Sequence, residues 1–371
     1  MTGLILQFGT SRFLQAHADL FLHEAREAGQ DVPPVVIVQT SGAAERAGRL
    51  AAFADPAGFP VIIRGLENGA PVERRMAVRS VSRGLSTSRD WAEVADLFAN
   101  EADFILSNTG DAGYAADPHE VAGGITLETP LASFPGKLLQ LLHARWQRGG
   151  RPLTVLPCEL VNRNGPVLKA IVRDLAVTAG TSAEFLRYLD KDVLFANTLV
   201  DRIVSAPLEP AGAVAEPYAL WAIERAPGLR RPCEHPSIVL TDDLEPFERL
   251  KLHILNLGHT VLAEIWRRED RPEGETVREI LADPAVAPRL AAIYADEVLP
   301  GFAAHGMEDA ARAYAATTMD RFRNPYLDHR IADIAGNHAL KVERRIAAFL
   351  DWAGTHAPAL SSIVSGRRAA A

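Results

Sequence analysis

The N-terminal half of the chain alternates short apolar runs with segments of helical periodicity, and no other feature constrains the fold as strongly. Leu4–Gly9 is an apolar run that ends in glycine, and Phe13–Gly29 follows it with apolar residues at helical spacing. Similar apolar runs recur at Pro33–Gly42, Asp103–Gly110 and Pro152–Gly165. Near-continuous apolar strands separated by helices are typical of a parallel sheet that is covered on both faces.

The pattern of the sequence differs before and after about residue 197. Before it, the segment from residue 60 to 85 also reads as strands, around the turn signal Asn68-Gly69. From Glu216 onward, in contrast, the segments read mostly as helices, including "EPYALWAIERA" and the long run "HRIADIAGNHALKVERRIAAFLDWA". We therefore expect an α/β domain over residues 1–197 and a mainly helical domain over residues 198–371.

Composition limits the classes of protein that this chain can belong to. Of its 371 residues 48% are hydrophobic, which suffices for two domains, and a net charge of -8 argues against a general nucleic-acid binder. Cys158 and Cys233 are too few for a disulfide framework. No signal-peptide pattern is visible, and no apolar run reaches the roughly 18–20 residues of a membrane helix. The sequence predicts a cytoplasmic globular protein without nucleic-acid or membrane partners, and leaves its oligomeric state open.

The turn after the first apolar run lies where a Rossmann-type domain binds the phosphates of a dinucleotide. Gly9 ends the predicted strand and a predicted helix follows, so backbone N–H groups can face a pyrophosphate. The motif is incomplete, because Ser11 and Leu14 stand where the second and third glycines belong. The next predicted strand ends near Thr40 without the acidic residue that usually holds the ribose. The choice between NAD and NADP stays open, since Arg46 could accommodate a 2′-phosphate.

"RLKLHILNLGHTVL", Arg249–Leu262, reads as a helix that is apolar almost all round, yet it carries Lys251, Asn256 and His259. Polar groups are costly to bury unless they are paired or in use. On an α-helix Asn256 lies roughly 140° and His259 roughly 80° round from Lys251, so the three share one sector. A single such residue is more often a satisfied buried group, but three together indicate a site.

These three residue types suit proton transfer at a carbonyl or alcohol carbon. Burial lowers the pKa of an amine, and an amine poised nearer neutrality can take or return the proton of an alcohol as hydride moves. The Asn256 amide can donate to the oxygen on which charge builds up, and His259 could orient the lysine or bond the same oxygen. A zinc site is not favoured, because lysine and asparagine are poor ligands and no His/Cys cluster accompanies them. Hydrolase and phosphate-loop motifs are absent.

The same helix resembles a known family. "KLHILNLGH" fits the K-x4-N-x2-H signature of the polyol-specific long-chain dehydrogenases, the mannitol dehydrogenase family. The resemblance spans about residues 4–345 of the chain. Further blocks resemble the family in the same order: "ILQFGTSRFLQAH", "SNTGDAGY", "PCELVNRNG", "FANTLVDRIV", "EPYALWAIE" and "RFRNPYLDHRI".

The resemblance implies a fold, a cofactor and a reaction. The fold is an α/β Rossmann-type N-terminal domain plus a mainly α-helical C-terminal domain, and the cofactor is NAD, with NADP left open. The reaction is metal-independent hydride transfer with Lys251 as general acid/base, Asn256 in the oxyanion hole and His259 in support. "VVIVQTSG", "SNTGDAGY", "PCEL" and "ILNLGHT" resemble the branch that acts on keto-sugar acids of the tagaturonate or fructuronate type. A mannitol-type polyol or polyol-phosphate dehydrogenase and a non-catalytic dinucleotide sensor are the alternatives.

The remaining candidates are binding residues. In mannitol dehydrogenases a second oxyanion-hole amide lies in a block that here reads Cys158-Glu159-Leu160, so Asn162 or Asn164 replaces that amide or the donor is missing. Arg330 and Lys341 lie near a family region that contacts the far end of the substrate, and either hold a carboxylate or are surface charges. The predicted cofactor-binding residues are Phe8, Gly9, Thr10, Ser11, Arg12, Phe13, Thr40, Ser107, Asn108, Thr109 and Asp201.

Overall fold

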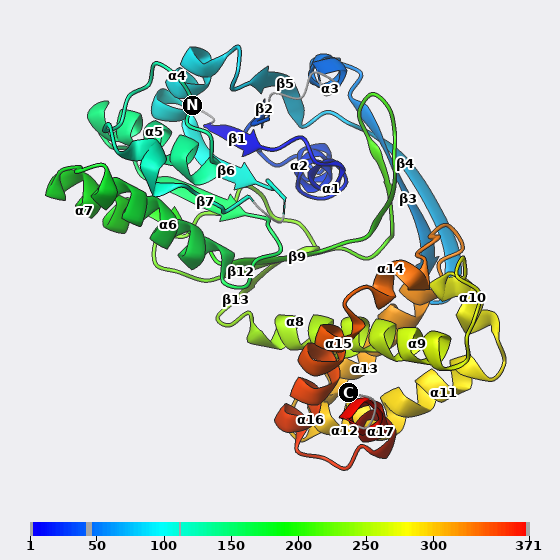
Figure 1. Ribbon diagram of the computed structural model, residues 1–371. Coiled ribbons are helices and arrows are strands. Elements are labelled where there is room, and N and C mark those ends of the chain that lie inside the picture. The colour runs from blue at the N-terminus through cyan, green and yellow to red at the C-terminus, as the bar shows by residue number, and fades with distance from the viewer. Residues whose placement is uncertain (1–2, 42–46, 111–112, 369–371) are drawn as a thin grey trace. The chain divides into compact units, whose positions relative to one another are not determined.

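The computed structural model describes residues 3–41, 47–110 and 113–368 and divides the chain into two compact units (Figure 1). Unit 1 comprises Met1–Ile62, Arg75–Ala215 and Ala219–Leu244. Unit 2 comprises Ile63–Arg74, Glu216–Tyr218 and Glu245–Ala371.

A six-stranded sheet with the strand order β5-β2-β1-β6-β7-β8 forms the centre of unit 1, and its neighbouring strands pair in parallel. The apolar runs of the sequence supply the central strands, and β1, β2 and β7 are buried along their whole length because helices cover both faces. The strands are β1 (Leu4–Phe8), β2 (Val35–Gln39), β5 (Val81–Ser86), β6 (Ala102–Ser107), β7 (Leu153–Pro157) and β8 (Val193–Phe195).

Helices cover both faces of this sheet. Leu4, Leu6 and Phe8 share one face of β1 and belong to one hydrophobic cluster with α4, α5, α6 and α7. On the opposite face the Gln7 amide donates to the Asp19 carboxyl group of α2, at 3.2 Å. The helices of unit 1 are α1 (Arg12–Gln15), α2 (Ala18–Glu27), α3 (Ala47–Ala52), α4 (Trp91–Asn100), a 3₁₀ turn η2 (Pro118–Val121), α5 (Phe134–Gln147), α6 (Asn164–Thr178) and α7 (Ala183–Lys191).

Two smaller sheets complete the strands. One has the order β10-β11-β3-β4 and the other the order β13-β12-β9. The predicted turn Asn68-Gly69 joins β3 to β4, and both residues have positive φ angles, of 53° and 75°. The strands are β3 (Phe59–Glu67), β4 (Ala70–Val78), β9 (Thr198–Asp201), β10 (Val204–Pro207), β11 (Ala213–Ala215), β12 (Leu220–Glu224) and β13 (Ile238–Thr241).

The helix expected in "EPYALWAIERA" is wrong, because Leu220–Glu224 is strand β12. Trp221, Ala222 and Ile223 are consecutive and wholly buried, since β12 pairs with β9 on one side and β13 on the other. A short run buried on both faces has no alternation that distinguishes a strand from a helix. Through these strands unit 1 continues to Leu244, past the division at residue 197 that the sequence suggested.

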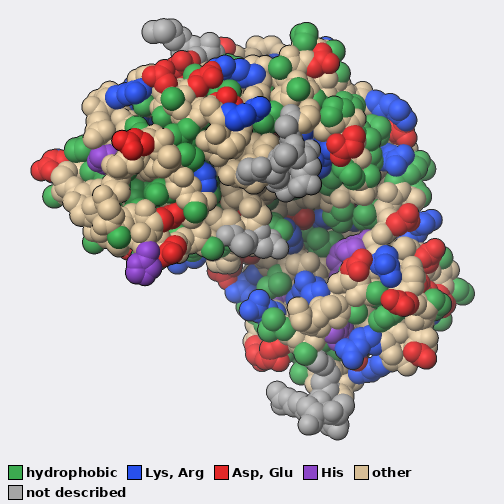
Figure 2. Space-filling view, turned by 45° about the horizontal axis from the view of Figure 1, so that its top comes forward, with side chains coloured by type: hydrophobic (Ala, Val, Ile, Leu, Met, Phe, Trp, Pro, Cys, Tyr) green, Lys and Arg blue, Asp and Glu red, His purple; other side chains and the backbone are tan. Residues whose placement is uncertain are grey.

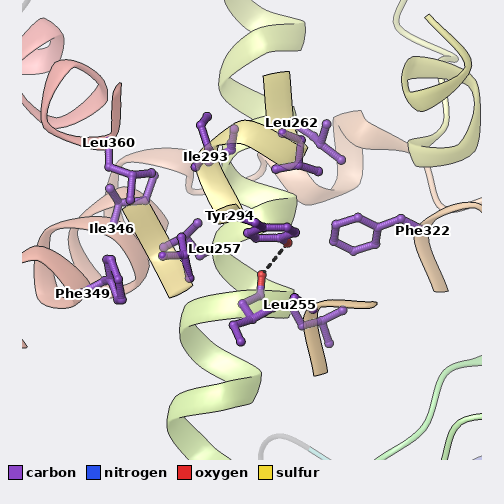
Figure 3. Packing of buried hydrophobic residues seen from close by; sticks show 14 of the residues in the cluster. Leu255, Leu257, Leu262, Ile293, Tyr294, Phe322, Ile346, Phe349 and Leu360 are labelled. Atoms are coloured by element: carbon purple, nitrogen blue, oxygen red, sulfur yellow. Dashed lines mark hydrogen bonds between the residues drawn. The ribbon is translucent and has the colours of Figure 1, made fainter. Parts of the chain in front are cut away.

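Unit 2 is mainly helical, as predicted, and its helices pack around α9 and η3 on one large hydrophobic cluster (Figure 3). The run from residue 329 to 353 does not form one helix, because it is interrupted at Gly336 and Asn337, where Asn337 has a φ of 53°. The helices are α8 (Glu245–Leu250), η3 (Lys251–Asn256), α9 (Leu257–Arg268), α10 (Val277–Ala282), α11 (Val286–Ile293), η4 (Tyr294–Val298), α12 (Leu299–Ala303), α13 (Glu308–Phe322), α14 (Ile331–Ala335), α15 (His338–Val342), η5 (Glu343–Ala347), α16 (Ala348–Ala353) and α17 (Pro358–Arg368); η3, η4 and η5 are π-helical.

The surface carries charges of both signs. On the face drawn in Figure 2, acidic and basic side chains are interspersed. Many of them form exposed ion pairs, such as that between Arg312 and Glu308 at 2.8 Å. Within the described residues, no helix has both the length and the apolar character that crossing a bilayer requires.

Candidate active site

The helix that carries Lys251, Asn256 and His259 is not α-helical throughout. Lys251–Asn256 is the π-helical segment η3, with α8 before it and α9 after it. In a π-helix the backbone N–H bonds the carbonyl five residues earlier, so Lys251 and Asn256 lie about one turn apart. The angle of roughly 140° between Lys251 and Asn256, which assumed an α-helix, was therefore wrong. The wider π-helical turn brings these two side chains closer to the same helix face. Asn256 and His259 keep helical i, i+3 spacing.

Each member of the trio has a different environment. Lys251 and Asn256 are half-buried, while His259 is buried with 7% of its surface exposed. Within the described residues no group hydrogen-bonds the Asn256 side chain, so its amide N–H groups are available to an oxygen of a ligand. The His259 ring packs 4.4 Å from the Phe322 ring and 5.1 Å from the His329 ring, centroid to centroid. This packing holds the imidazole ring in place.

Two cations lie next to this trio. Arg345, on η5, donates from Nη1 to the Asn256 carbonyl at 3.3 Å and to the Thr260 hydroxyl at 3.2 Å. Lys341, one helical turn earlier, donates to the Ile334 carbonyl at 2.6 Å. Burial, and then the nearby Arg345 charge, lower the pKa of Lys341, and burial lowers the pKa of Arg345. No carboxylate among the described residues forms an ion pair with either cation.

His329 completes this group. Burial lowers the pKa of His329, the exposed Asp333 opposes that shift, and the Lys341 charge adds to it. Six residues are named the polar cluster below: Lys251, Asn256, His259, His329, Lys341 and Arg345. The sequence pointed to Lys251, Asn256, His259 and Lys341 but missed His329 and Arg345. The signal for Arg345 is its position four residues after Lys341, which puts both on one helix face.

The other predicted substrate residues are exposed or already hydrogen-bonded within the protein. Arg330 is about half exposed and its nearest acid is Glu273, 4.0 Å away at the surface. Asn164 is fully buried and already satisfied: its Nδ2 donates to the carbonyls of Pro157 and Glu159, and its Oδ1 accepts from the backbone of Gly165 and Thr198. Asn164 therefore holds the chain after β7, whereas Asn162 is exposed.

The turn between β1 and α1 follows the strand–turn–helix order that the sequence predicted. Gly9 has a φ of 112°, and a Cβ there would lie 2.5 Å from the Asn108 carbonyl oxygen, so the close approach of the two strand ends requires glycine. The Ser11 hydroxyl accepts from the Leu14 N–H and caps α1. The Thr10 carbonyl accepts from Arg49 of α3 at 3.0 Å. Arg46 and the rest of 42–46 lie outside the described residues.

The side chains around this turn have separate tasks. Phe8 is fully buried, with its ring 5.6 Å from the Phe134 ring, so it contributes packing. Arg12 is held by the Glu209 carboxylate at 2.6 Å and by the Gly212 carbonyl at 3.1 Å. Phe13 stacks on the His17 ring at 4.7 Å. Thr40 follows directly on β2 and is half-buried. These contacts leave the backbone of the turn as the part that fits a pyrophosphate.

The carboxylate of Glu159 organises the neighbouring strand end, and sequence reasoning missed this role. Glu159 is 4% exposed and accepts from the Ser107 hydroxyl, from the backbone and hydroxyl of Thr109, and from the Tyr114 hydroxyl, at 3.0 to 3.2 Å. Asn108 donates to the Cys158 carbonyl at 2.7 Å. The predicted cofactor-binding segment from Ser107 to Thr109 is thus held by Cys158 and Glu159, in the block where the family resemblance places the second oxyanion-hole amide.

Asp201, the last predicted cofactor residue, ends β9 and is buried. Its charge raises, and that of the adjacent Arg202 lowers, the pKa of His17, but burial dominates and lowers that pKa to about 3. The turn at Gly9, the helix that follows it and the ordered strand end at Ser107 are the parts of unit 1 that fit a dinucleotide. Within the described residues, no group of three His, Cys, Asp or Glu side chains is arranged to hold a metal ion.

Comparison with known proteins identifies two domains of one family in this chain. Residues 4–232 match the family model described as the mannitol dehydrogenase Rossmann domain, and residues 243–363 match that of the mannitol dehydrogenase C-terminal domain. Altronate oxidoreductases of Halalkalibacterium halodurans and Bacillus subtilis are each 29% identical over 92% of this chain. The chain covers 69% and 73% of their respective lengths.

Solved structures support the fold. A substrate-free D-sorbitol dehydrogenase superposes with a TM-score of 0.75 at 19% identity, covering 94% of this chain and 76% of its own. Mannitol 2-dehydrogenase from Pseudomonas fluorescens, in a ternary complex with NAD and D-mannitol, has a TM-score of 0.74 at 18% identity, covering 98% and 78%. The predicted Rossmann-type domain followed by a helical domain is confirmed.

The fold and the matched domains define an NAD-dependent oxidoreductase that acts on a CH–OH group of a polyol or sugar acid. The chain belongs to the mannitol dehydrogenase family. The resemblance to its sugar-acid branch, also named tagaturonate reductase or altronate oxidoreductase, is confirmed by the names of the curated relatives.

Proposed function

We propose that this protein interconverts a keto-sugar acid of the tagaturonate or fructuronate type and its secondary alcohol. NAD supplies or accepts the hydride when bound. Unit 1 holds the dinucleotide through the turn at Gly9 and the strand end that Glu159 orders. Unit 2 supplies the proton and the contacts to the sugar acid.

Lys251 is the general acid/base in this proposal. In the reductive direction its ammonium gives a proton to the oxygen of the former carbonyl, and in the oxidative direction its amine takes the alcohol proton. The Asn256 amide, which no described residue engages, donates to the same oxygen and stabilises the negative charge that develops on it. His259, fixed between Phe322 and His329, supports the lysine or bonds the same oxygen.

One observation carries the sugar-acid part of the proposal: Lys341 and Arg345 form no ion pair with a described carboxylate although both are partly buried. A desolvated cation without a counter-ion is costly, and that cost is recovered when an anion binds. A guanidinium and an ammonium together match the two oxygens of a carboxylate. A neutral polyol would leave both charges uncompensated.

The lysine mechanism is tested with Lys251→Ala. We expect turnover to fall by roughly 10²–10⁴-fold, the usual range for a lost general acid/base, while NADH still binds. Steady-state rates with the uronates and NADH fluorescence titrations measure the two properties separately. Lys191→Ala, at the exposed end of α7, is the matched control and should resemble the wild type. Near-wild-type turnover of Lys251→Ala would exclude the mechanism.

A further inference from the structure

The π-helical turn at Lys251 is held in place by a residue from another helix. The Tyr294 hydroxyl donates to the Ile254 carbonyl, in the middle of η3, at 2.9 Å (Figure 3). Tyr294 is 4% exposed, and burial raises the pKa of its hydroxyl far above the usual value, so it remains a donor at any working pH. A π-helical turn disturbs the usual pattern of backbone bonds, so an outside donor to one of its carbonyls stabilises the wider turn.

Gly258 makes room for this hydroxyl. A Cβ at Gly258 would overlap Tyr294 Oη and would lie 3.0 Å from the Phe322 ring. Phe322 in turn packs on His259. Any residue larger than glycine would therefore push away either the donor of the η3 bond or the ring that fixes the imidazole.

A second donor holds the other end of the same segment. Arg345 Nη1 bonds the Asn256 carbonyl, and the Thr260 hydroxyl donates to that carbonyl too, at 2.9 Å. The backbone of η3 is thus fixed at Ile254 from η4 and at Asn256 from η5. The Ile254 carbonyl lies between Lys251 and Asn256 in the chain, and the other carbonyl belongs to Asn256 itself. The backbone geometry at these positions sets the angle between the Lys251 and Asn256 side chains.

From these contacts we propose that Tyr294 is a positioning residue for the reaction. By stabilising the π-helical turn, it keeps the Lys251 side chain on the same helix face as Asn256 and His259. Tyr294 does not touch the reacting atoms in this scheme. It acts through the backbone, and Gly258 is the space that lets it do so. The inference rests on the proposed role of Lys251.

The first test is Tyr294→Phe, which keeps the ring and removes one hydrogen bond. We expect kcat with a keto-sugar acid to fall about tenfold, the KM for NADH to stay unchanged, and the pH profile of kcat to shift, because Lys251 no longer meets the same neighbours. Tyr188→Phe is the matched control. Tyr188 is as buried and also donates to a backbone carbonyl, that of Arg151 at 3.2 Å, but it lies in unit 1.

A double-variant cycle separates positioning from general damage. Gly258→Ala alone should lower kcat strongly, because the new Cβ displaces the hydroxyl. In a Tyr294→Phe background the same substitution should cost clearly less than in the wild type, since the closest contact of the new Cβ, with the hydroxyl, is gone and only the looser contacts at 3.0 and 3.1 Å with the Phe322 ring and the ring at position 294 remain. Additive losses, or an unchanged pH profile in Tyr294→Phe, would overturn the inference.

A measurement that needs no substrate tests the positioning role of Tyr294 separately from the proposed reaction. The rate at which acetic anhydride modifies Lys251 can be followed by mass spectrometry against pH, in the wild type and in Tyr294→Phe. A shifted profile supports the positioning role even if no uronate is turned over. If Lys251→Ala is inactive but Tyr294→Phe matches the wild type in both assays, only the positioning inference fails.

Discussion

Lys341 and Arg345 show how far residue types alone can identify a site. The sequence resemblance singled out Lys341 and Arg330, and the structure places Lys341 beside Arg345 while Arg330 stays at the surface. Arg345 was missed because its contacts, with Asn256 and Thr260, join residues 89 and 85 positions apart in the chain. Glu159 was missed for the same reason, since its donors lie about fifty residues before it.

Lys341→Met should therefore weaken the binding of an acid substrate. We expect KM for the uronate to rise by roughly 10–100-fold with little change in kcat, because a hydrogen bond to a charged group contributes about 1.5–3 kcal/mol. Steady-state kinetics measure both constants. Arg330→Met serves as the control and should leave KM within about twofold of the wild type.

The same lysine predicts the sign of a pH effect. Burial and the Arg345 charge lower the pKa of Lys341, so its charged form, which binds a carboxylate, is lost as pH rises through that lowered pKa. KM for the uronate in the wild type should increase toward alkaline pH. In Lys341→Met this increase should be smaller, and an identical slope in both proteins would contradict the assignment.

At the scale of elements, the parallel strands, the hairpin turn and the helical second half follow from local patterns. Strand β12, the interruption of the run from residue 329 to 353 and the π-helical turn η3 did not. Strand β12 is buried on both faces, so its sequence lacks alternation. The π-helical turn η3 could not be predicted because the hydroxyl that bonds its Ile254 carbonyl comes from Tyr294, 40 residues further along the chain.

The turn between β1 and α1 yields a prediction at this scale. Gly9→Ala places a Cβ 2.5 Å from the Asn108 carbonyl at a φ that alanine rarely adopts, so the two strand ends must separate. We expect the Kd for NADH to rise by at least about tenfold, measured by fluorescence titration. Gly123→Ala is the control, because a Cβ there meets no atom within 4 Å. Equal NADH affinity in both variants would show that the turn does not contact the dinucleotide.

At the scale of the whole molecule, two buried ionisable groups shape the dependence of stability on pH. Burial raises the pKa of Asp19 to about 7 and lowers the pKa of His17 to about 3. The folded state thus keeps a proton on Asp19 where an unfolded aspartate has lost it, so stability falls as pH rises from about 4 to 7. His17 acts in the opposite sense, because stability falls as pH drops below about 6.5.

Asp19→Asn removes the first of these effects. The difference in free energy of unfolding between the variant and the wild type should change by about 3 kcal/mol, in favour of the variant, as the pH rises from about 5 to 8. Urea denaturation at both pH values measures the difference, and Asp31→Asn, an exposed position, should show little of it. A difference between Asp19→Asn and the wild type that does not change with pH would contradict a raised pKa at Asp19.

NADH oxidation with four candidate substrates tests most directly whether the protein reduces a keto-sugar acid, with hydride from NADH and with the polar cluster supplying the proton and binding the carboxylate. The four substrates are tagaturonate, fructuronate, fructose and fructose 6-phosphate, with NADPH in parallel. We expect turnover with one or both uronates and none with fructose or its phosphate. Turnover with fructose or fructose 6-phosphate would contradict the carboxylate assignment of Lys341 and Arg345 while keeping the family. NADH binding without oxidation on any of the four would contradict the proposed reaction and favour a non-catalytic dinucleotide sensor.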